Sequence, residues 1–218
     1  MSTITSTTPP ASPGLPGWLP PRIYRMTLAE YERMVAAGLI PSRNRIHLIN
    51  GYLVEKMTQN PPHVVAVNRS RDELDRIKPP GWHLRSAQPI RLPGQDSEPE
   101  PDHCLTRGVN EDYLEGHPGP ADIALVVEVA GTSLAEDRDY ATRLYGPAGI
   151  PACWIVDDNG RGVEVYSHPG PQGYASTETF AEGQSVPLMI DGREAGRIAV
   201  ADILPPRRPR AAAAGNGA

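Results

Sequence analysis

A single carboxylate, Glu128, stands in an otherwise apolar run, IALVVEV, at residues 123–129. A run this apolar is typical of a strand that is buried on both faces. A carboxylate in such a strand is costly unless it is paired, protonated or bound to a cation. Two explanations of Glu128 are therefore open at this point, a buried ion pair with an arginine and a metal site.

A second carboxylate, Asp102, opens another strand-like run at residues 102–105. Adjacent strands of a sheet lie about 4.8 Å apart, so two carboxylates at strand ends can reach one cation. Mg²⁺ takes oxygen ligands at about 2.1 Å and keeps several waters, which leaves positions for a substrate. Such an ion can activate a water molecule and offset the charge of a scissile phosphate. The pair therefore favours a metal site with Asp102 and Glu128 as ligands.

Short local signals predict the elements of the N-terminal half. Thr27 and Glu30 form a capping box that begins a helix, and Gly38 is placed to end it. Asn50-Gly51 is a strong turn signal between two strand-like runs. The expected elements after the first helix are strands at 45–50 and 52–57, a helix at 63–77, and strands at 82–92 and 102–105.

The C-terminal half continues with a helix between two buried strands. Ser133 and Glu136 read as a second capping box, and the helix that they begin should fade near Pro147 and Gly149. The expected elements after it are a buried strand at 152–157, a hairpin partner at 162–166, and short edge strands and turns to about residue 203. Strands joined by a crossing helix indicate the α/β class.

The composition indicates one globular domain at residues 22–204. The chain has 218 residues, and its 25 prolines crowd the two ends, so we expect a disordered flank at 1–21 and a flexible tail at 205–218. Cys104 and Cys153 lie in apolar runs, which suits reduced, buried thiols. A net charge of −5 gives no general attraction to nucleic acid. Neither a membrane-spanning run nor a secretory signal is recognised, so a cytoplasmic protein is expected.

Several motifs in one order resemble the Uma-type family of restriction endonucleases. They are TLAEY in the first helix, INGYLVEKM after it, PPH ending at residue 63, EPEPD ending at 102, VVEV around 128, and LYGPAGIPACWIVD at 144–157. The resemblance implies a PD-(D/E)XK nuclease core, which is a restriction-endonuclease-like mixed central sheet flanked by helices. It also implies a metal-dependent phosphodiesterase that uses Mg²⁺ or Mn²⁺ and has DNA as its partner, with a homodimer as one open arrangement.

The resemblance carries over to both acidic ligands but not to the usual lysine. Asp102 matches the Asp of the Pro-Asp element, and Glu128 matches the acidic residue of the next element. A PD-(D/E)XK strand would have Lys at Ala130, and the Uma-type helix would have it at Ala141. His47 stands where the family usually has an acidic residue. Because a cationic partner can contribute a few kcal/mol to the transition state, these losses leave a slow or inactive enzyme open as an alternative to an active one.

Other side chains could complete the site. Arg138 shares a helix face with Ala141 and is the best replacement for the lysine, although a guanidinium cannot transfer protons. Four residues could line the site: His47, Glu55, His63 and Gln88. For three of them another interpretation is equally open. Glu55 could be exposed to solvent, His63 could cap its helix, and Gln88 could be an ordinary strand residue. His103 should point to the face of its strand opposite to Asp102.

Two interpretations of the function follow. The first is a Mg²⁺-dependent endonuclease that hydrolyses DNA phosphodiester bonds, with Asp102 and Glu128 as metal ligands and Arg138 as the cation. The second is a catalytically inactive relative that keeps the nuclease fold as a binding module. Convergence of the two carboxylates next to a cation would favour the first interpretation, and a Glu128 paired with an arginine would favour the second.

Overall fold

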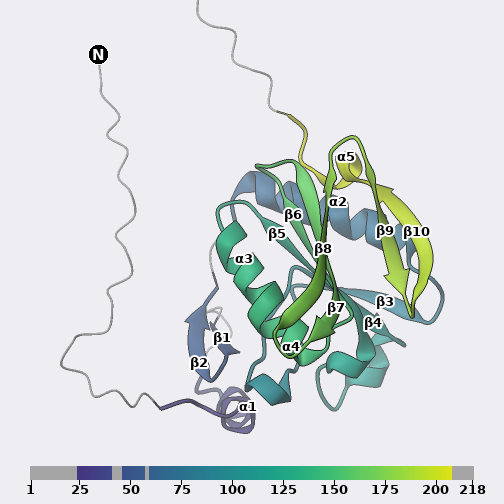
Figure 1. Ribbon diagram of the computed structural model, residues 1–218. Helices are drawn as coiled ribbons and strands as arrows, with labels where there is room; N and C mark the ends of the chain where they lie inside the picture. The colour runs from purple at the N-terminus through teal and green to yellow at the C-terminus, as the bar shows by residue number, and fades with distance from the viewer. Residues whose placement is uncertain (1–23, 41–45, 57–58, 208–218) are drawn as a thin grey trace, which may run out of the picture.

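The computed structural model describes residues 24–40, 46–56 and 59–207, and its centre is a six-stranded mixed sheet (Figure 1). The strands lie in the order β3, β4, β5, β6, β7, β8, and only β5 and β6 run parallel. Their bounds are β3 Trp82–Ser86, β4 His103–Arg107, β5 Ile123–Ala130, β6 Ala152–Asp157, β7 Gly162–Gly170 and β8 Gly173–Ala181. The α/β class and the mixed central sheet are therefore confirmed.

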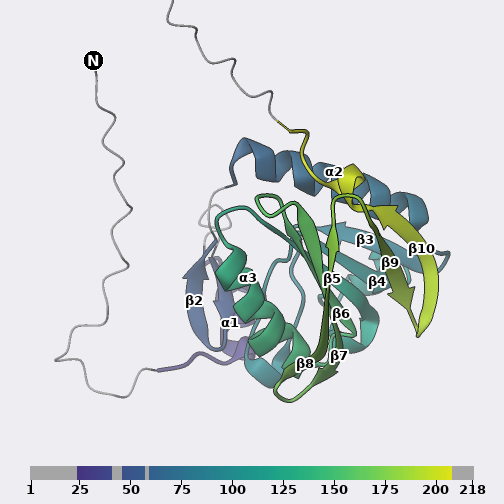
Figure 2. The same ribbon diagram turned by 45° about the horizontal axis from the view of Figure 1, so that its top comes forward.

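Helices cover both faces of this sheet (Figure 1, Figure 2). Helix α2 (Pro61–Ile77) packs on one face, next to the hairpin β9 (Ser185–Ile190) and β10 (Arg193–Ala199) and to the short α5 (Val200–Ile203). The connection from β5 to β6 covers the other face with α3 (Leu134–Tyr140), the π-helical turn η5 (Ala141–Tyr145) and α4 (Gly146–Ala148). Each face thus has its own apolar cluster, and β5 is buried along its whole length.

Alternation along β5 assigns Glu128 to one of these faces. Leu125, Val127 and Val129 belong to the cluster under α2, whereas Val126 and Ala130 belong to the cluster under η5. Successive side chains of a strand point to opposite faces, so Glu128 points with the second group toward α3 and η5. The connection from β5 to β6, which consists of α3, η5 and α4 and is called the roof below, therefore covers the buried carboxylate.

A small N-terminal unit packs beside this roofed face. It consists of α1 (Leu28–Ala36) and the hairpin β1 (Ile46–Ile49) and β2 (Tyr52–Glu55). The capping box of Thr27 and Glu30 is present, and the hairpin turns at Asn50-Gly51 with positive φ at both residues, as expected. A Cβ at Gly51 would lie 2.8 Å from the Cβ of Arg25, so only glycine fits the turn. The unit is joined to the domain by backbone bonds to Asp96 and Glu98.

Several predicted boundaries were wrong. Helix α2 begins two residues before His63, because Asn60 is its N-cap. The side chain of Asn60 accepts a hydrogen bond from the backbone amide of His63. The strand expected at 82–92 ends at residue 86, and β8, expected to be short, has nine residues. Ser133 makes no capping bond and donates instead to Asp137, so the second capping box does not form. The short elements between strands are η2 Pro93–Gln95, η3 Asn110–Tyr113 and η4 Pro120–Asp122.

The remaining expectations concern the ends, the thiols and the membrane. The flank predicted at 1–21 lies outside the described residues, as does the tail predicted at 205–218 except for 205–207, where Arg207 pairs with Glu182. Cys104 and Cys153 are buried free thiols. Over the part of the chain that is described, no helix has the length and apolar character needed to span a membrane.

Candidate active site

Asp102 and Glu128 lie opposite each other on neighbouring strands. The register of β4 with β5 pairs His103 with Val127, so the next position brings Asp102, which directly precedes β4, against Glu128. The backbone amide of Asp102 donates to Glu128 Oε2 at 3.2 Å, and the amide of Val129 donates to Asp102 Oδ2 at 2.9 Å. The two carboxylates therefore converge and are fixed by the backbone of the sheet itself.

The second oxygen of Glu128 is held from the roof. The hydroxyl of Tyr145, at the end of the π-helical turn η5, donates to Glu128 Oε1 at 2.6 Å. Tyr145 has no exposed surface, and Glu128 keeps 8%. A π-helical turn adds one residue to the helical repeat and occurs frequently at functional sites. Here the turn positions Tyr145 so that its hydroxyl fixes the carboxylate.

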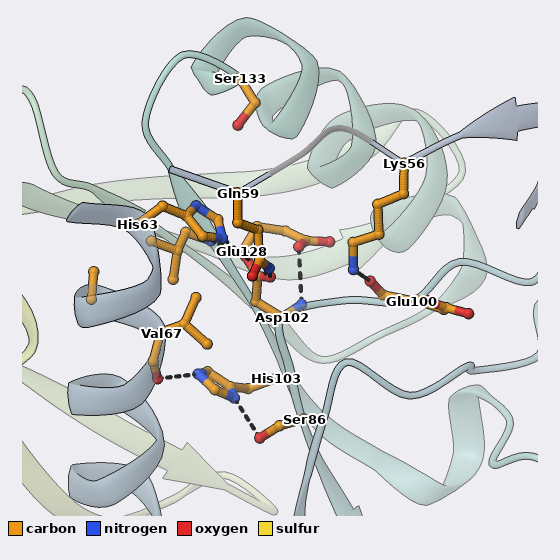
Figure 3. A network of polar contacts seen from close by, with 12 residues as sticks. Lys56, Gln59, His63, Val67, Ser86, Glu100, Asp102, His103, Glu128 and Ser133 are labelled. Atoms are coloured by element: carbon orange, nitrogen blue, oxygen red, sulfur yellow. Dashed lines mark hydrogen bonds and ion pairs between the residues drawn. The ribbon is translucent and has the colours of Figure 1, made fainter. Parts of the chain in front are cut away.

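A cavity of about 150 Å³ opens over this pair of carboxylates. Figure 3 shows Glu128 and Asp102 side by side at its floor, with His63, Gln59, Ser133 and Lys56 around them. The full lining is His47, Glu55, Lys56, Gln59, Asn60, His63, Pro99, Glu100, Asp102, Glu128, Val129, Gly131, Thr132, Ser133, Glu136, Asp137, Tyr140 and Tyr145. Carboxylates thus dominate the charge of the cavity.

A third buried carboxylate, Asp137, shares the cavity with the pair. Burial raises the pKa of Asp137 to about 7, and the charge of Asp102 adds to that rise, while the hydroxyl of Ser133 opposes it. Burial also raises the pKa of Glu128 well above its ordinary value, and the charges of Asp102 and Asp137 reinforce the effect. Carboxylates that repel each other in a buried place are stabilised by a bound cation.

Asp102 behaves differently from its two neighbours. Burial alone would raise its pKa, but His63, the amide of Val129 and the charge of Lys56 hold the pKa below its ordinary value. His63 Nε2 lies 3.6 Å from Asp102 Oδ1, and the side-chain amide of Gln59 donates to the same oxygen at 3.3 Å. Burial opposes the charged form of His63, yet Asp102 raises its pKa above the usual value. Asp102 is therefore the carboxylate that stays ionised.

His47 is the least satisfied polar group of the cavity. It is 6% exposed, and neither ring nitrogen has a hydrogen-bond partner among the described residues. Burial, aided by the charge of Lys56, lowers the pKa of His47 to about 4, so the ring is neutral at neutral pH. An unpaired buried imidazole is costly for the fold. The unpaired ring of His47 is therefore a sign that the cavity accommodates a ligand.

The predicted site residues separate into two groups. Asp102, Glu128, His47, Glu55 and His63 all line the cavity. Gln88 and Arg138 do not, since Gln88 is exposed and Arg138 forms an ion pair with Glu164 on β7. The structure therefore does not place the guanidinium of Arg138 beside the carboxylates.

The sequence did not predict four further residues of the site. Tyr145 and Asp137 lie in the connection between β5 and β6, and Gln59 and Lys56 follow the N-terminal hairpin. Lys56 lies in the INGYLVEKM motif and Tyr145 in the LYGPAGIPACWIVD motif, but the resemblance alone gives neither a role. No local pattern assigns any of the four to the site, since their roles depend on how the roof and the hairpin pack.

Comparisons with known proteins identify the family and the fold of the chain. The sequence profile of the Uma2 family, described as "Putative restriction endonuclease", matches residues 28–200. The chain belongs to the Uma2 family. A protein from Anabaena variabilis, whose crystal structure is described as that of "a putative nuclease", has the same fold with a TM-score of 0.62 and 17% sequence identity. The match covers 82% of this Uma2 chain and 97% of that one. No curated protein matches the sequence.

Proposed function

We propose that this Uma2 protein is a metal-dependent nuclease that hydrolyses phosphodiester bonds of DNA, with Asp102 and Glu128 holding Mg²⁺ or Mn²⁺. The observation that carries the proposal is the interlocked pair of carboxylates at the floor of a cavity that also contains Asp137. In this proposal the protein works on DNA in the cytoplasm, and a homodimer would present two such sites to the two strands.

The donor set fits a hard divalent cation. Asp102 and Glu128 offer carboxylate oxygens, which are the ligands that Mg²⁺ and Mn²⁺ prefer. Within the described residues, no three His, Cys, Asp or Glu side chains are grouped so as to enclose a metal ion by themselves. A cation held by two carboxylates would therefore keep water and substrate as its other ligands. Such an ion supplies an activated water and offsets the charge on the phosphate.

The chain's own residues would orient the two carboxylates and offset the charge of the phosphate. The amide of Val129 fixes one oxygen of Asp102 and leaves Oδ1 directed to the cavity, near Gln59 and His63. Tyr145 holds Glu128 in place from the roof. A phosphate that enters would meet His63, whose protonated form is favoured by Asp102. These groups are positioned before the substrate binds, which is what electrostatic stabilisation of a transition state requires.

The competing function is binding without catalysis, and one observation favours it. Ala130 and Ala141, the two positions where a lysine was expected, are fully buried in the apolar cluster under η5. Neither position supplies an amine to the cavity. The proposal therefore depends on another cation, unless the protein only binds nucleic acid.

The test is a titration of Mg²⁺ and of Mn²⁺ against the purified protein, with cleavage of plasmid and of single-stranded DNA measured in parallel. Asp102→Asn is the inactive variant, and Asp72→Asn, an exposed carboxylate on α2, is the matched control. We expect metal-dependent cleavage that Asp102→Asn abolishes and Asp72→Asn leaves unchanged. DNA binding without cleavage at any metal concentration would favour the binding module instead.

A further inference from the structure

We infer that Lys56 is the phosphate-binding cation of this site and that its ammonium group contacts a non-bridging oxygen of the substrate beside Asp102. The inference rests on the proposed function and deepens it. It assigns the missing amine to the end of the N-terminal hairpin rather than to β5 or to the helix that roofs the site.

The position of Lys56 is fixed by the segment that carries Asp102. Lys56 directly follows β2, and its Nζ donates to the backbone carbonyl of Glu100 at 2.6 Å, two residues before Asp102. Figure 3 shows the side chain extending toward Glu100 on the side of the cavity where Glu128 lies. An ammonium group has three donors, and among the described residues this carbonyl is the partner of one of them. Within residues 24–40, 46–56 and 59–207, the other two donors have no hydrogen-bond partner and can contact a ligand.

The charge of the cavity calls for such a group. Six carboxylates line the cavity, those of Glu55, Glu100, Asp102, Glu128, Glu136 and Asp137. Among the lining residues that the structure describes, Lys56 is the single lysine or arginine. A phosphodiester that approached these carboxylates would be repelled unless cations offset them. Lys56 contributes a positive charge that is independent of the metal.

The arginines near the roof are already engaged. Arg138 is paired with Glu164, and Arg143 is paired with Asp139 at 2.9 Å and is largely exposed. Neither lines the cavity. Their ion pairs therefore engage both guanidinium groups outside the cavity lining. Lys56 is thus the lysine or arginine that a substrate in the cavity would meet, in addition to His63.

The chemistry of lysine suits a contact with a single phosphate oxygen. The chain has only two lysines, and the second, Lys78, ends α2 with an ion pair to Asp75 at 2.5 Å. An ammonium group is a compact point charge that suits one phosphate oxygen, whereas a guanidinium group demands a planar, two-pronged partner. Lys78 therefore provides a matched control of the same residue type far from Asp102 in the fold.

Two measurements test the inference. The first is DNA cleavage by Lys56→Met, which keeps the apolar stem and removes the charge, by Lys56→Arg, which keeps the charge, and by Lys78→Met. We expect Lys56→Met to lower kcat/KM by about 100-fold, Lys56→Arg to recover part of it, and Lys78→Met to match the wild type. Melting temperatures of the three variants separate this effect from a loss of folding.

The second measurement does not require turnover. The wild-type protein is acylated with an amine-reactive ester, alone and with a DNA duplex plus Mg²⁺, and the labelling of its two lysines is read by mass spectrometry. We expect DNA and Mg²⁺ to protect Lys56 and not Lys78. Protection in a protein that does not cleave would support the contact with phosphate while refuting the nuclease. Unchanged labelling of Lys56, or unchanged cleavage by Lys56→Met in a protein that Asp102→Asn inactivates, would overturn the inference alone.

Discussion

Asp102 and His103 are neighbours in the chain but belong to two polar clusters on opposite faces of the sheet, and the two clusters differ in how their polar groups are paired. Asp102 points into the cavity under α3 and η5, where its charge raises the pKa of Glu128 and of Asp137. His103, the next residue, points to the face under α2 and has no exposed surface. Its Nε2 lies 2.9 Å from the carbonyl of Val67, which can only accept, so Nε2 carries the proton. Its Nδ1 then accepts from the hydroxyl of Ser86 at 2.8 Å.

This difference indicates that the cluster of His103 stabilises the fold, whereas the cluster of Asp102 serves the function. The cluster of His103 is closed, because its donors and acceptors are paired inside the protein and burial keeps the ring neutral with a lowered pKa. The cluster of Asp102 is open, because its groups face a cavity and are unfavourable for one another. Proteins keep such unfavourable groups where a ligand uses them. The following variants test this division.

The largest expected effect is the loss of function in Asp102→Asn. Asn keeps an oxygen that can accept from the amide of Val129, so the unfolding free energy should change by less than about 1 kcal/mol. Metal-dependent cleavage should fall on the order of 10³-fold, because a ligand charge is lost. Cleavage rates and urea denaturation of the same preparation check both halves. A variant that unfolds easily yet cleaves normally would reverse the assignment of the open cluster.

His103→Ala should show the opposite pattern. It removes the buried imidazole that pairs with the hydroxyls of Ser86 and Ser70 and with the carbonyl of Val67, which costs about 2–4 kcal/mol of unfolding free energy. Cleavage per folded molecule should stay within a few-fold of the wild type. Urea denaturation, together with rates measured below the unfolding transition, separates the two quantities. A stable but inactive variant would place His103 in the functional cluster.

His47 gives the open cluster a dependence on pH. Its pKa is about 4 in the fold, lowered by burial, against 6.5 for a free ring. The unfolded chain therefore binds the additional proton between these values, so the stability is intact above pH 6.5 and is lost as the pH falls toward 4. His47→Leu should remove about 2 kcal/mol of this loss between pH 7 and pH 4.5. Unfolding free energies across this range, with exposed His168→Asn as control, measure it.

The smallest expected effect belongs to the contact that joins the roof to the floor. Tyr145→Phe removes the hydroxyl that donates to Glu128, which should cost about 1 kcal/mol of unfolding free energy. It should also weaken Mn²⁺ binding several-fold, because Glu128 is less well oriented. Calorimetric titration with Mn²⁺ checks the second effect. Unchanged binding would make Tyr145 a structural residue only.

The fold was predictable where local signals agree with packing. The capping box at Thr27, the turn at Asn50-Gly51 and the apolar run around Glu128 all specify their elements within a few residues. Prediction failed where a side chain had a better partner at a distance. Ser133 bonds to Asp137 rather than capping its helix, because that carboxylate is buried beside it.

The site was predictable as far as strand alternation reaches. Asp102 and Glu128 follow from two strands and their pairing, and the same alternation gives the opposite direction of His103. Arg138 was chosen from a helix face, but it pairs with Glu164 on β7, which the sequence does not place nearby. Lys56 reaches the site only because the N-terminal hairpin docks beside Glu100, a contact 44 residues away in the chain.

The central claim is that Asp102 and Glu128 hold one divalent cation, and an anomalous difference map of crystals soaked in Mn²⁺ tests it most directly. We expect one peak between the two carboxylates, within about 2.2 Å of an oxygen of each, and no peak there in Asp102→Asn. Mn²⁺ bound only elsewhere, or an empty cavity at saturating Mn²⁺ with both carboxylates still hydrogen-bonded to the sheet, would show that Asp102 and Glu128 do not form a metal site.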